Sequence, residues 1–236
     1  MNETVYIVQN DSSVSHQVAT LLISRGRAAK VLESAEALLE RVTSRVSPDP
    51  QCLVCDIQLP LLGGLALMTE LRKRRVYLPT VFYTERPNLV DAVKAIRLGA
   101  LDVIERSSDH ERLIQSVGDA LNHYRSTWQM EQRRRSTLER LRSLSDGEQQ
   151  VLDGILRGML NKEIASTLQL SIRTVEQRRR QIFRKLDVQH PAALAQRVVE
   201  ATNSSWEDTI QDQQQPLGTN FFFLAIPSVS PMPQLV

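Results

Sequence analysis

The chain has 236 residues, of which 42% are hydrophobic, and this allows two modest domains that each bury a core of their own. The formal charge of +2 is unevenly spread: residues 1–124 hold 14 Lys and Arg against 15 Asp and Glu, whereas residues 125–199 hold 15 against 8. This net +7 indicates that only the second segment meets a polyanion. No run approaches the roughly 18 apolar residues of a membrane span, and MNETVYIVQN is unlike a secretion signal, so we expect a cytoplasmic protein without a membrane partner.

Short apolar runs alternate with helix-period segments over residues 1–124. In the helical segments apolar residues recur every three or four positions, and Gly26 and Gly99 mark helix ends. Parallel strands need helical crossovers, so five such units predict an α/β fold with helices on both faces of a parallel sheet. The expected strands are Val5–Val8, Ala28–Leu32, Cys52–Ile57, Thr80–Thr84 and Leu101–Ile104.

The third expected strand, in the segment CLVCDIQLP, ends on a lone carboxylate, Asp56. Open parallel sheets bind ligands where the strand order reverses, and in the order 2-1-3-4-5 this crevice lies between the first and third strands. Gln9, Asn10 and Asp11 follow the first strand. The sequence therefore predicts that these side chains meet Asp56 at one edge of the sheet.

The rest of the chain is expected to be helical up to about residue 203. Residues 125–143 are polar and free of Gly and Pro, which predicts an exposed helical linker. Two helices joined by the turn 169–171, the second of them basic, form the helix-turn-helix pattern. Residues 204–236 predict a disordered tail, with packing of the FFFLAI run against a domain as the alternative. The expected helices after the linker are Asp146–Arg157, Asn161–Leu168, Ile172–Asp187 and Pro191–Ala201.

The basic helix has two distinct faces when its residues are placed about 100° apart. Ile182 and Leu186 lie within about 20° of Val175, which defines a buried stripe. Arg179 lies about 40° from this stripe and is expected to be structural. The opposite face, between about 140° and 200°, holds Arg173, Gln177, Arg180 and Arg184.

Side-chain chemistry assigns different DNA contacts to these residues. In the major groove Arg can donate twice to guanine and Gln can pair with adenine, so Gln177 and Arg180 are the first candidates for base contacts, followed by Glu176. Most other contacts go to phosphates and position the protein. In the alternative reading, the arginines form a solvated face and the chain is an interaction adaptor without DNA readout. The expected phosphate contacts are Arg173, Arg178 and Arg184.

The order of these motifs resembles the FixJ/NarL type of two-component response regulator. The resemblance covers about residues 4–201 and implies a flavodoxin-like (βα)5 receiver domain at 1–124, a linker at 125–143 and an all-α four-helix LuxR-type domain at 144–203. It implies a transcription regulator rather than an enzyme, which binds double-stranded DNA as a homodimer and is served by a histidine kinase. The matching stretches are CLVCDIQLPLLGGLAL, LPTVFYT, AVKAIRLGALDVIE and LSDGEQQVLDGILRGMLNKEIASTLQLSIRTVEQRRRQIFRKL.

The same resemblance implies roles for single residues. Asp56 matches the phosphate acceptor, Thr84 the hydroxyl that bonds the phosphate, and Arg106 the lysine that pairs with it. The acidic pair that helps to hold Mg²⁺ falls on Gln9 and Asn10. The family's groove contacts fall on Glu176, Gln177 and Arg180, and its phosphate contacts on Lys162 and Thr174.

These departures from the family pattern weaken the expected metal site. Mg²⁺ would be held by Asp56 and Asn10, with Asp11 in partial compensation, and its affinity should fall because ligand charge is lost. Three readings of Asp56 stay open: phosphorylation at a weakened site, a receiver that works without phosphate, and a structural Asp that bonds backbone N–H groups in the next loop. A phosphatase that resembles the haloacid dehalogenases would need a second Asp where Gln58 stands.

Two surfaces are candidates for the homodimer contact. In the receiver, the resemblance favours the face from Val90 to Leu98 together with the strand Leu101–Ile104. In the DNA-binding domain, Leu194 and Val198 with the alanines around them fit either a seam between two chains or the core of one.

Overall fold

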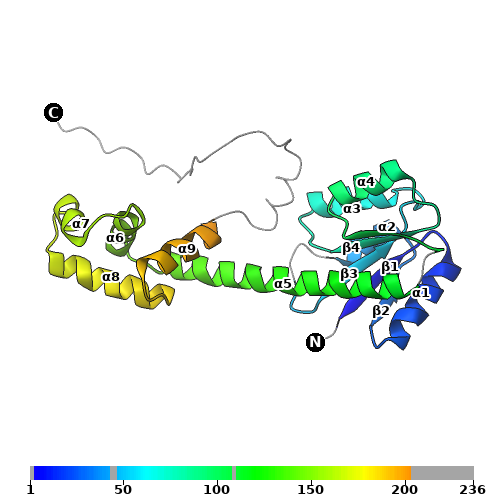
Figure 1. Ribbon diagram of the computed structural model, residues 1–236, viewed down its shortest axis with the longest axis horizontal. Helices are drawn as coiled ribbons and strands as arrows, with labels where there is room; N and C mark the ends of the chain where they lie inside the picture. The colour runs from blue at the N-terminus through cyan, green and yellow to red at the C-terminus, as the bar shows by residue number, and fades with distance from the viewer. Residues whose placement is uncertain (1–2, 43–46, 108–109, 203–236) are drawn as a thin grey trace.

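The computed structural model describes residues 3–42, 47–107 and 110–202. An α/β unit and a helical unit are joined by one long helix, as Figure 1 shows. The tail expected at 204–236 lies outside the described residues. No helix of the described part is long and apolar enough to cross a membrane.

The α/β unit has a single five-stranded parallel sheet. Its strand order is β2-β1-β3-β4-β5, with Val8 beside Cys55 and Thr84 beside Glu105 in the register. The flavodoxin-like order predicted from the sequence is confirmed, the fourth strand has the expected bounds, and the other strand ends differ from the expected ones by at most two residues. The strands are β1 Thr4–Val8, β2 Ala29–Val31, β3 Gln51–Cys55, β4 Thr80–Thr84 and β5 Asp102–Glu105.

Helices cover both faces of this sheet and enclose two cores. One core joins the sheet to α1 and α5 through residues such as Leu22 and Val117, and the other joins it to α2, α3 and α4 through Leu38, Leu67 and Ala95. The helices are α1 Ser12–Ser24, α2 Ala35–Arg41, α3 Gly64–Lys73, α4 Leu89–Arg97 and α5 His110–Arg142.

Helix α5 has 33 residues and continues from the α/β unit into the region expected as a linker. The sequence predicts that this region is helical and exposed. The helix is confirmed, but the predicted exposure is wrong for part of the region. Thr127, Glu131 and Thr137 are buried, and α9 packs alongside α5. Polar composition could not show this, because the neighbours come from distant parts of the chain: Thr127 bonds the hydroxyl of Tyr77, and α9 lies against α5.

The helical unit has the four helices expected from the sequence. One core holds them together, with Ile164 from α7, Val175 and Ile182 from α8, and Leu194 from α9 nearly or fully buried in it. Leu194 therefore serves the core of a single chain. The helices are α6 Asp146–Leu156, α7 Asn161–Thr167, α8 Ile172–Leu186 and α9 Pro191–Thr202.

Candidate functional site

Asp56 follows β3 and is held in place by its own backbone. Its N–H donates to the carbonyl of Val8 at 3.0 Å, which continues the β1–β3 pairing by one residue. A Cβ atom on Gly64, the first residue of α3, would lie only 2.2 Å from the carbonyl oxygen of Asp56. Only glycine lets α3 begin this close to the strand end.

Asp56 is only 4% exposed, and both oxygens of its carboxylate accept hydrogen bonds. Oδ1 accepts from the hydroxyl of Thr84 at 2.7 Å and from the backbone N–H of Gln58 at 3.0 Å. Oδ2 accepts from the guanidinium of Arg106, with which it forms an ion pair. The bond from Gln58 is the backbone contact that the structural reading of Asp56 predicts.

Arg106 follows β5, and its guanidinium reaches across the end of the sheet. The side chain is only 17% exposed, and Nη2 also donates to Oε1 of Gln9 at 3.0 Å. Gln9 is buried at the end of β1. We call Gln9, Asp56, Thr84 and Arg106 the Asp56 pocket. Each of its four residues ends or follows a different strand, so the fold brings together positions up to 97 residues apart.

Asn10 and Asp11 do not enter this pocket. Both are exposed, and the carboxylate of Asp11 accepts from the N–H of Ser13 at 2.8 Å and thereby caps α1. These bonds to Ser13 lower the pKa of Asp11. The structure therefore gives Asp11 a helix-capping role, and an Asp directly before the helical run SSVSHQV is the sequence pattern that could have predicted it.

The oxygen atoms of the pocket are not available as ligands for Mg²⁺. This ion takes hard oxygen ligands and usually retains several waters, but the Asp56 oxygens and Oε1 of Gln9 already accept from Thr84, Gln58 and Arg106. Across residues 3–42, 47–107 and 110–202, no three carboxylate, imidazole or thiol side chains converge as metal ligands. The guanidinium also brings positive charge to the place where a cation would have to bind.

The second candidate site is the basic helix α8. Ser171 caps its first turn by accepting from the N–H of Thr174 at 3.1 Å. Val175, Ile182 and Leu186 are fully buried, which confirms the stripe predicted at 100° per residue. The opposite face of the helix must therefore point away from the core.

Three basic residues of α8 hold the helical unit together. Arg178 donates to the carbonyl of Gly147 at 3.3 Å, and Lys185 donates to Glu148 at 2.7 Å. Arg179 donates to Asn161 at 3.1 Å and lies over the ring of Phe183, as the structural role expected for it requires. The sequence predicts a phosphate contact for Arg178, whereas in the structure its guanidinium bonds the start of α6.

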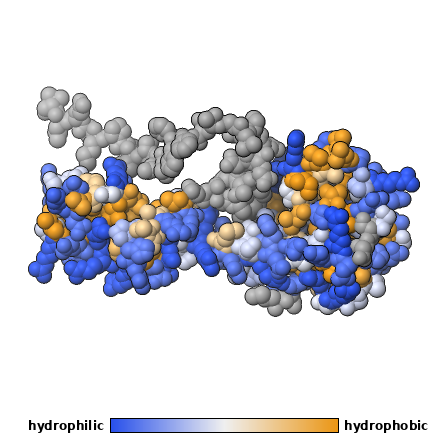
Figure 2. Space-filling view, in the orientation of Figure 1, coloured by the Kyte–Doolittle hydropathy of each residue, from blue (hydrophilic) through white to orange (hydrophobic). Residues whose placement is uncertain are grey.

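The other predicted contact residues of α7 and α8 are presented to solvent. Within the described part of the chain, no hydrogen bond or ion pair engages the guanidinium groups of Arg173, Arg180 or Arg184, and all three residues are exposed. Thr174 is half-buried, and its hydroxyl bonds that of Ser171 at 2.8 Å. Figure 2 shows a hydrophilic surface where α8 lies. The exposed residues are Lys162, Arg173, Glu176, Gln177, Arg180 and Arg184.

Sequence reasoning missed the network that fixes α8 to the start of α6. Glu148 accepts from the N–H of Ser145 at 2.8 Å in a capping box and also from Lys185 of α8. These contacts lower the pKa of Glu148, the bond from Lys185 most strongly. The Ser145-x-x-Glu148 spacing is a recognisable capping signal, but the partner on α8 is 37 residues away.

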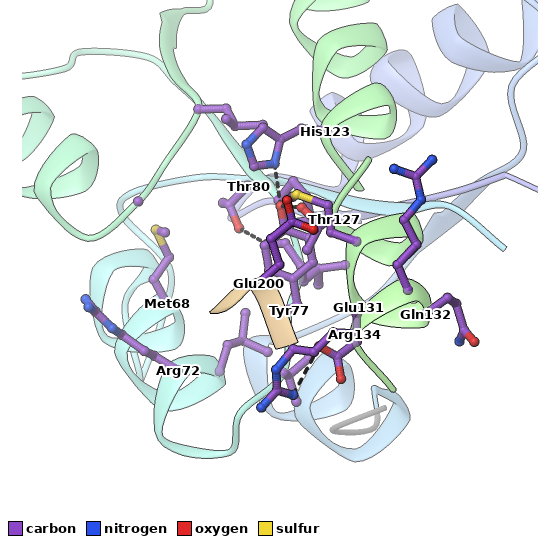
Figure 3. Close-up of a pocket in the computed structure, with 18 of the residues that line it drawn as sticks. Met68, Arg72, Tyr77, Thr80, His123, Thr127, Glu131, Gln132, Arg134 and Glu200 are labelled. Atoms are coloured by element: carbon purple, nitrogen blue, oxygen red, sulfur yellow. Dashed lines mark hydrogen bonds and ion pairs between the residues drawn. The ribbon is translucent and has the colours of Figure 1, made fainter. Parts of the chain in front are cut away.

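A groove of about 1440 Å³ lies away from both sites, where the α/β unit, α5 and α9 meet. Figure 3 shows Tyr77, His123 and Thr127 together on its wall. Thr127 donates to the hydroxyl of Tyr77 at 3.0 Å, and burial raises the pKa of Tyr77 to about 12. Asp56 does not line this groove, which separates it from the pocket chemistry.

Comparison with known proteins agrees with this division of the chain. The model of the response regulator receiver domain matches residues 5–118, and that of the bacterial regulatory proteins of the luxR family matches residues 142–198. The transcriptional regulatory protein FixJ of Azorhizobium caulinodans is 33% identical over 182 residues, which cover 77% of this chain and 85% of FixJ. The response regulator protein TodT of Pseudomonas putida is 32% identical over 203 residues, covering 86% and 88%. Among solved structures, the response regulator StyR superposes with a TM-score of 0.72 at 28% identity and covers 84% of this chain and 98% of StyR.

Proposed function

The chain belongs to the response regulators that carry a receiver domain and a LuxR-type DNA-binding domain, the family of its relatives FixJ and TodT, and from this premise we propose that α8 reads a specific DNA sequence. The observation that carries the proposal is the exposed face of α8. There Gln177 and Arg180 stand beside Arg173 and Arg184, and an α-helix of this kind fits the major groove.

The DNA contacts divide by reach and chemistry. Gln177 and Arg180 contact base edges, and Glu176 accepts from a neighbouring base. Phosphates are contacted by the residues that flank this centre, and Arg178 is assigned to domain packing because it donates to Gly147. The proposed phosphate contacts are Lys162, Arg173, Thr174 and Arg184.

Footprinting of the full chain on fragments of its own genome tests this proposal. We expect protected sites at moderate salt, which Arg180→Ala removes because a bidentate base contact is lost. The matched control is Arg157→Ala, which alters an exposed arginine of the same unit that pairs with Asp153. If the wild-type chain protects no site, the DNA function is refuted and the adaptor reading takes its place. If the wild-type chain protects sites but Arg180→Ala behaves like the control, only the base contact of Arg180 is refuted.

We also propose that the regulator acts as a homodimer through the α4–β5 face of the receiver. Leu89 is 79% exposed and Val90 is 62% exposed, and Val93, Ile96 and Leu101 are exposed beside them. Figure 2 shows an apolar surface in this region. Exposed apolar patches of this kind mark interaction sites, and a two-fold dimer suits paired half-sites in DNA. A protein that reads DNA works beside the chromosome, which supports a cytoplasmic location.

The receiver controls this DNA-binding unit, in our proposal, with little or no Mg²⁺-dependent phosphorylation of Asp56. The engagement of both carboxylate oxygens by Thr84, Gln58 and Arg106 supports this version. A conventional response regulator, phosphorylated by a histidine kinase, is the second candidate, because Thr84 and Arg106 already stand at Asp56. Intact mass after incubation with acetyl phosphate and Mg²⁺ separates the two: labelling of every chain that Asp56→Asn abolishes would establish the conventional version.

A further inference from the structure

We propose that Arg106 is the resident cation of the Asp56 pocket and stands where a divalent metal ion would otherwise neutralise the carboxylate. This inference rests on the proposed function and deepens it, because it names the group that makes Asp56 independent of Mg²⁺. In this proposal the ion pair joins the ends of the strands and takes the place of a metal site.

The geometry places the guanidinium between two acceptors. Nη2 of Arg106 donates to Oδ2 of Asp56 and to Oε1 of Gln9, and the backbone N–H of Arg106 donates to the carbonyl of Thr84 at 2.8 Å. The side chain is therefore fixed at its base and at its tip. Nη2 carries two N–H groups, so this one nitrogen can donate to both acceptors at once.

The charges of the pocket already cancel. Asp56 contributes −1 and Arg106 contributes +1, whereas Gln9 adds an oxygen acceptor without a charge. A carboxylate at position 9 would leave the pocket with an excess of −1. A second carboxylate at the exposed position 10, just outside the pocket, would raise the local excess to −2, which is the charge that a divalent ion balances. The amide at position 9 therefore lets the guanidinium approach and removes the demand for a metal ion.

The unused groups of the pocket point the same way. The buried atoms without a hydrogen-bond partner among the described residues include Nε2 of Gln9 and Nε of Arg106. Both are donors in their assigned orientation. A cation binds oxygen acceptors, whereas the two unpartnered atoms in the pocket are N–H donors.

The first experiment measures thermal unfolding of the full chain during a Mg²⁺ titration to about 20 mM. A ligand that binds the folded state raises the unfolding midpoint, and we expect a shift below about 1 °C in the wild-type chain. A clear rise that Asp56→Asn abolishes would overturn the proposal. Gln9→Asp with Asn10→Asp supplies the missing charge, and we expect this double variant to gain a Mg²⁺-dependent rise.

The second experiment compares Arg106→Met with a matched control, Arg112→Met. Arg112 pairs with Asp102 at 3.0 Å, but its side chain is 54% exposed. Removing one partner of a buried pair leaves an uncompensated charge, so Arg106→Met should lower the midpoint by on the order of 10 °C, and the control by little. Equal shifts in the two variants would overturn the proposal.

A double-variant cycle tests whether the effect belongs to the pair. Asp56→Asn keeps an acceptor for Thr84 and Gln58 but removes the charge, so adding it to Arg106→Met should cost less than its effect in the wild-type chain. Additive shifts would contradict a shared ion pair. DNA binding by the wild-type chain and by each folded variant is measured in parallel. If the wild-type chain does not bind DNA, the proposed function is refuted. If DNA binding is normal but the shifts in unfolding midpoint are additive, only the role of Arg106 is refuted.

Discussion

Arginine is the chief basic residue of both candidate sites, yet its surroundings differ completely between them. Arg106 lies at the buried end of the receiver sheet with two acceptors on its guanidinium, whereas Arg180 lies on the open face of α8. Arg178 and Arg179 stand between these extremes, since both bond neighbouring helices. The comparison teaches that the acceptors that the fold brings within reach, rather than the residue type, decide whether an arginine holds the protein together or reads a ligand.

The two regions should also respond differently to substitution. Breaking a buried ion pair by removing one partner is costly because the remaining charge has no solvent, whereas exposed charges contribute little to stability. Changes in the Asp56 pocket should therefore appear in unfolding, and changes on the face of α8 should appear in DNA binding. The following predictions test that separation, beginning with the largest expected effect.

Gly64→Ala should destabilise the receiver by about 3 kcal/mol, because overpacking against fixed backbone forces the start of α3 to move. The new Cβ would lie 2.2 Å from the carbonyl oxygen of Asp56. Urea unfolding of the full chain measures the change. Gly26→Ala is a useful reference, because its added Cβ meets no atom within 4 Å although its positive φ adds strain. If Gly64→Ala costs no more than Gly26→Ala, the pocket is less rigid than we describe.

Gln177→Ala should reduce discrimination at one base position by about 2 kcal/mol and leave stability unchanged, since a bidentate contact to adenine is lost. Binding to a set of operator variants, each with one base pair replaced, measures the change. Arg173→Ala provides the contrast, because a phosphate contact weakens binding to all sequences alike and lowers the salt slope by about one. The two variants would exchange roles if the assignment of base and phosphate contacts were wrong.

Thr84→Val should cost about 1 kcal/mol of stability, because Oδ1 of Asp56 loses one of its two hydrogen bonds in a buried site. The substitution keeps the shape of the side chain. Thr69→Val, whose hydroxyl bonds only the carbonyl of Leu65 within α3, is the matched control in chemical denaturation. We expect normal DNA binding from both variants, and a loss confined to Thr84→Val would show that the two regions are coupled.

Glu148→Gln should change how the stability of the helical unit depends on pH. The bond from Lys185 lowers the pKa of Glu148 from its ordinary value of 4.5, so its contribution is present above that value and disappears as the pH falls through the lowered pKa. The difference in unfolding free energy between wild type and variant should therefore shrink as the pH falls below 4.5. Glu139→Gln, an exposed change on α5, is the control, and a difference that stays constant with pH would contradict the tether.

Local periodicity predicted much of this architecture. The alternation of strands and helices placed Asp56 and Gln9 at one edge of the sheet, and the 100° placement separated the buried stripe of α8 from Arg180. These features depend on neighbours within a few residues. Periodicity reports which face a residue occupies, and this is sufficient for a helix that reads DNA.

Contacts between distant parts of the chain could not be predicted in this way. Periodicity leaves open whether the guanidinium of Arg106 points into solvent. The resemblance predicts that it pairs with a phosphate on Asp56, and the folded sheet shows that it bonds the carboxylate of Asp56 itself, 50 residues earlier. The same holds for Arg178, which bonds a carbonyl 31 residues before it. Sequence spacing contains no information on such pairs, so the missing metal ligands were predicted and the cation that replaces the metal was not.

The affinity of the full chain for its operator, with and without Mg²⁺ and acetyl phosphate, tests the central claim most directly. Our account holds that α8 reads DNA while Arg106 keeps Asp56 neutralised without metal. It predicts dissociation constants that agree within about twofold under the two conditions. A tightening of about tenfold or more that requires Mg²⁺ and disappears in Asp56→Asn would contradict it.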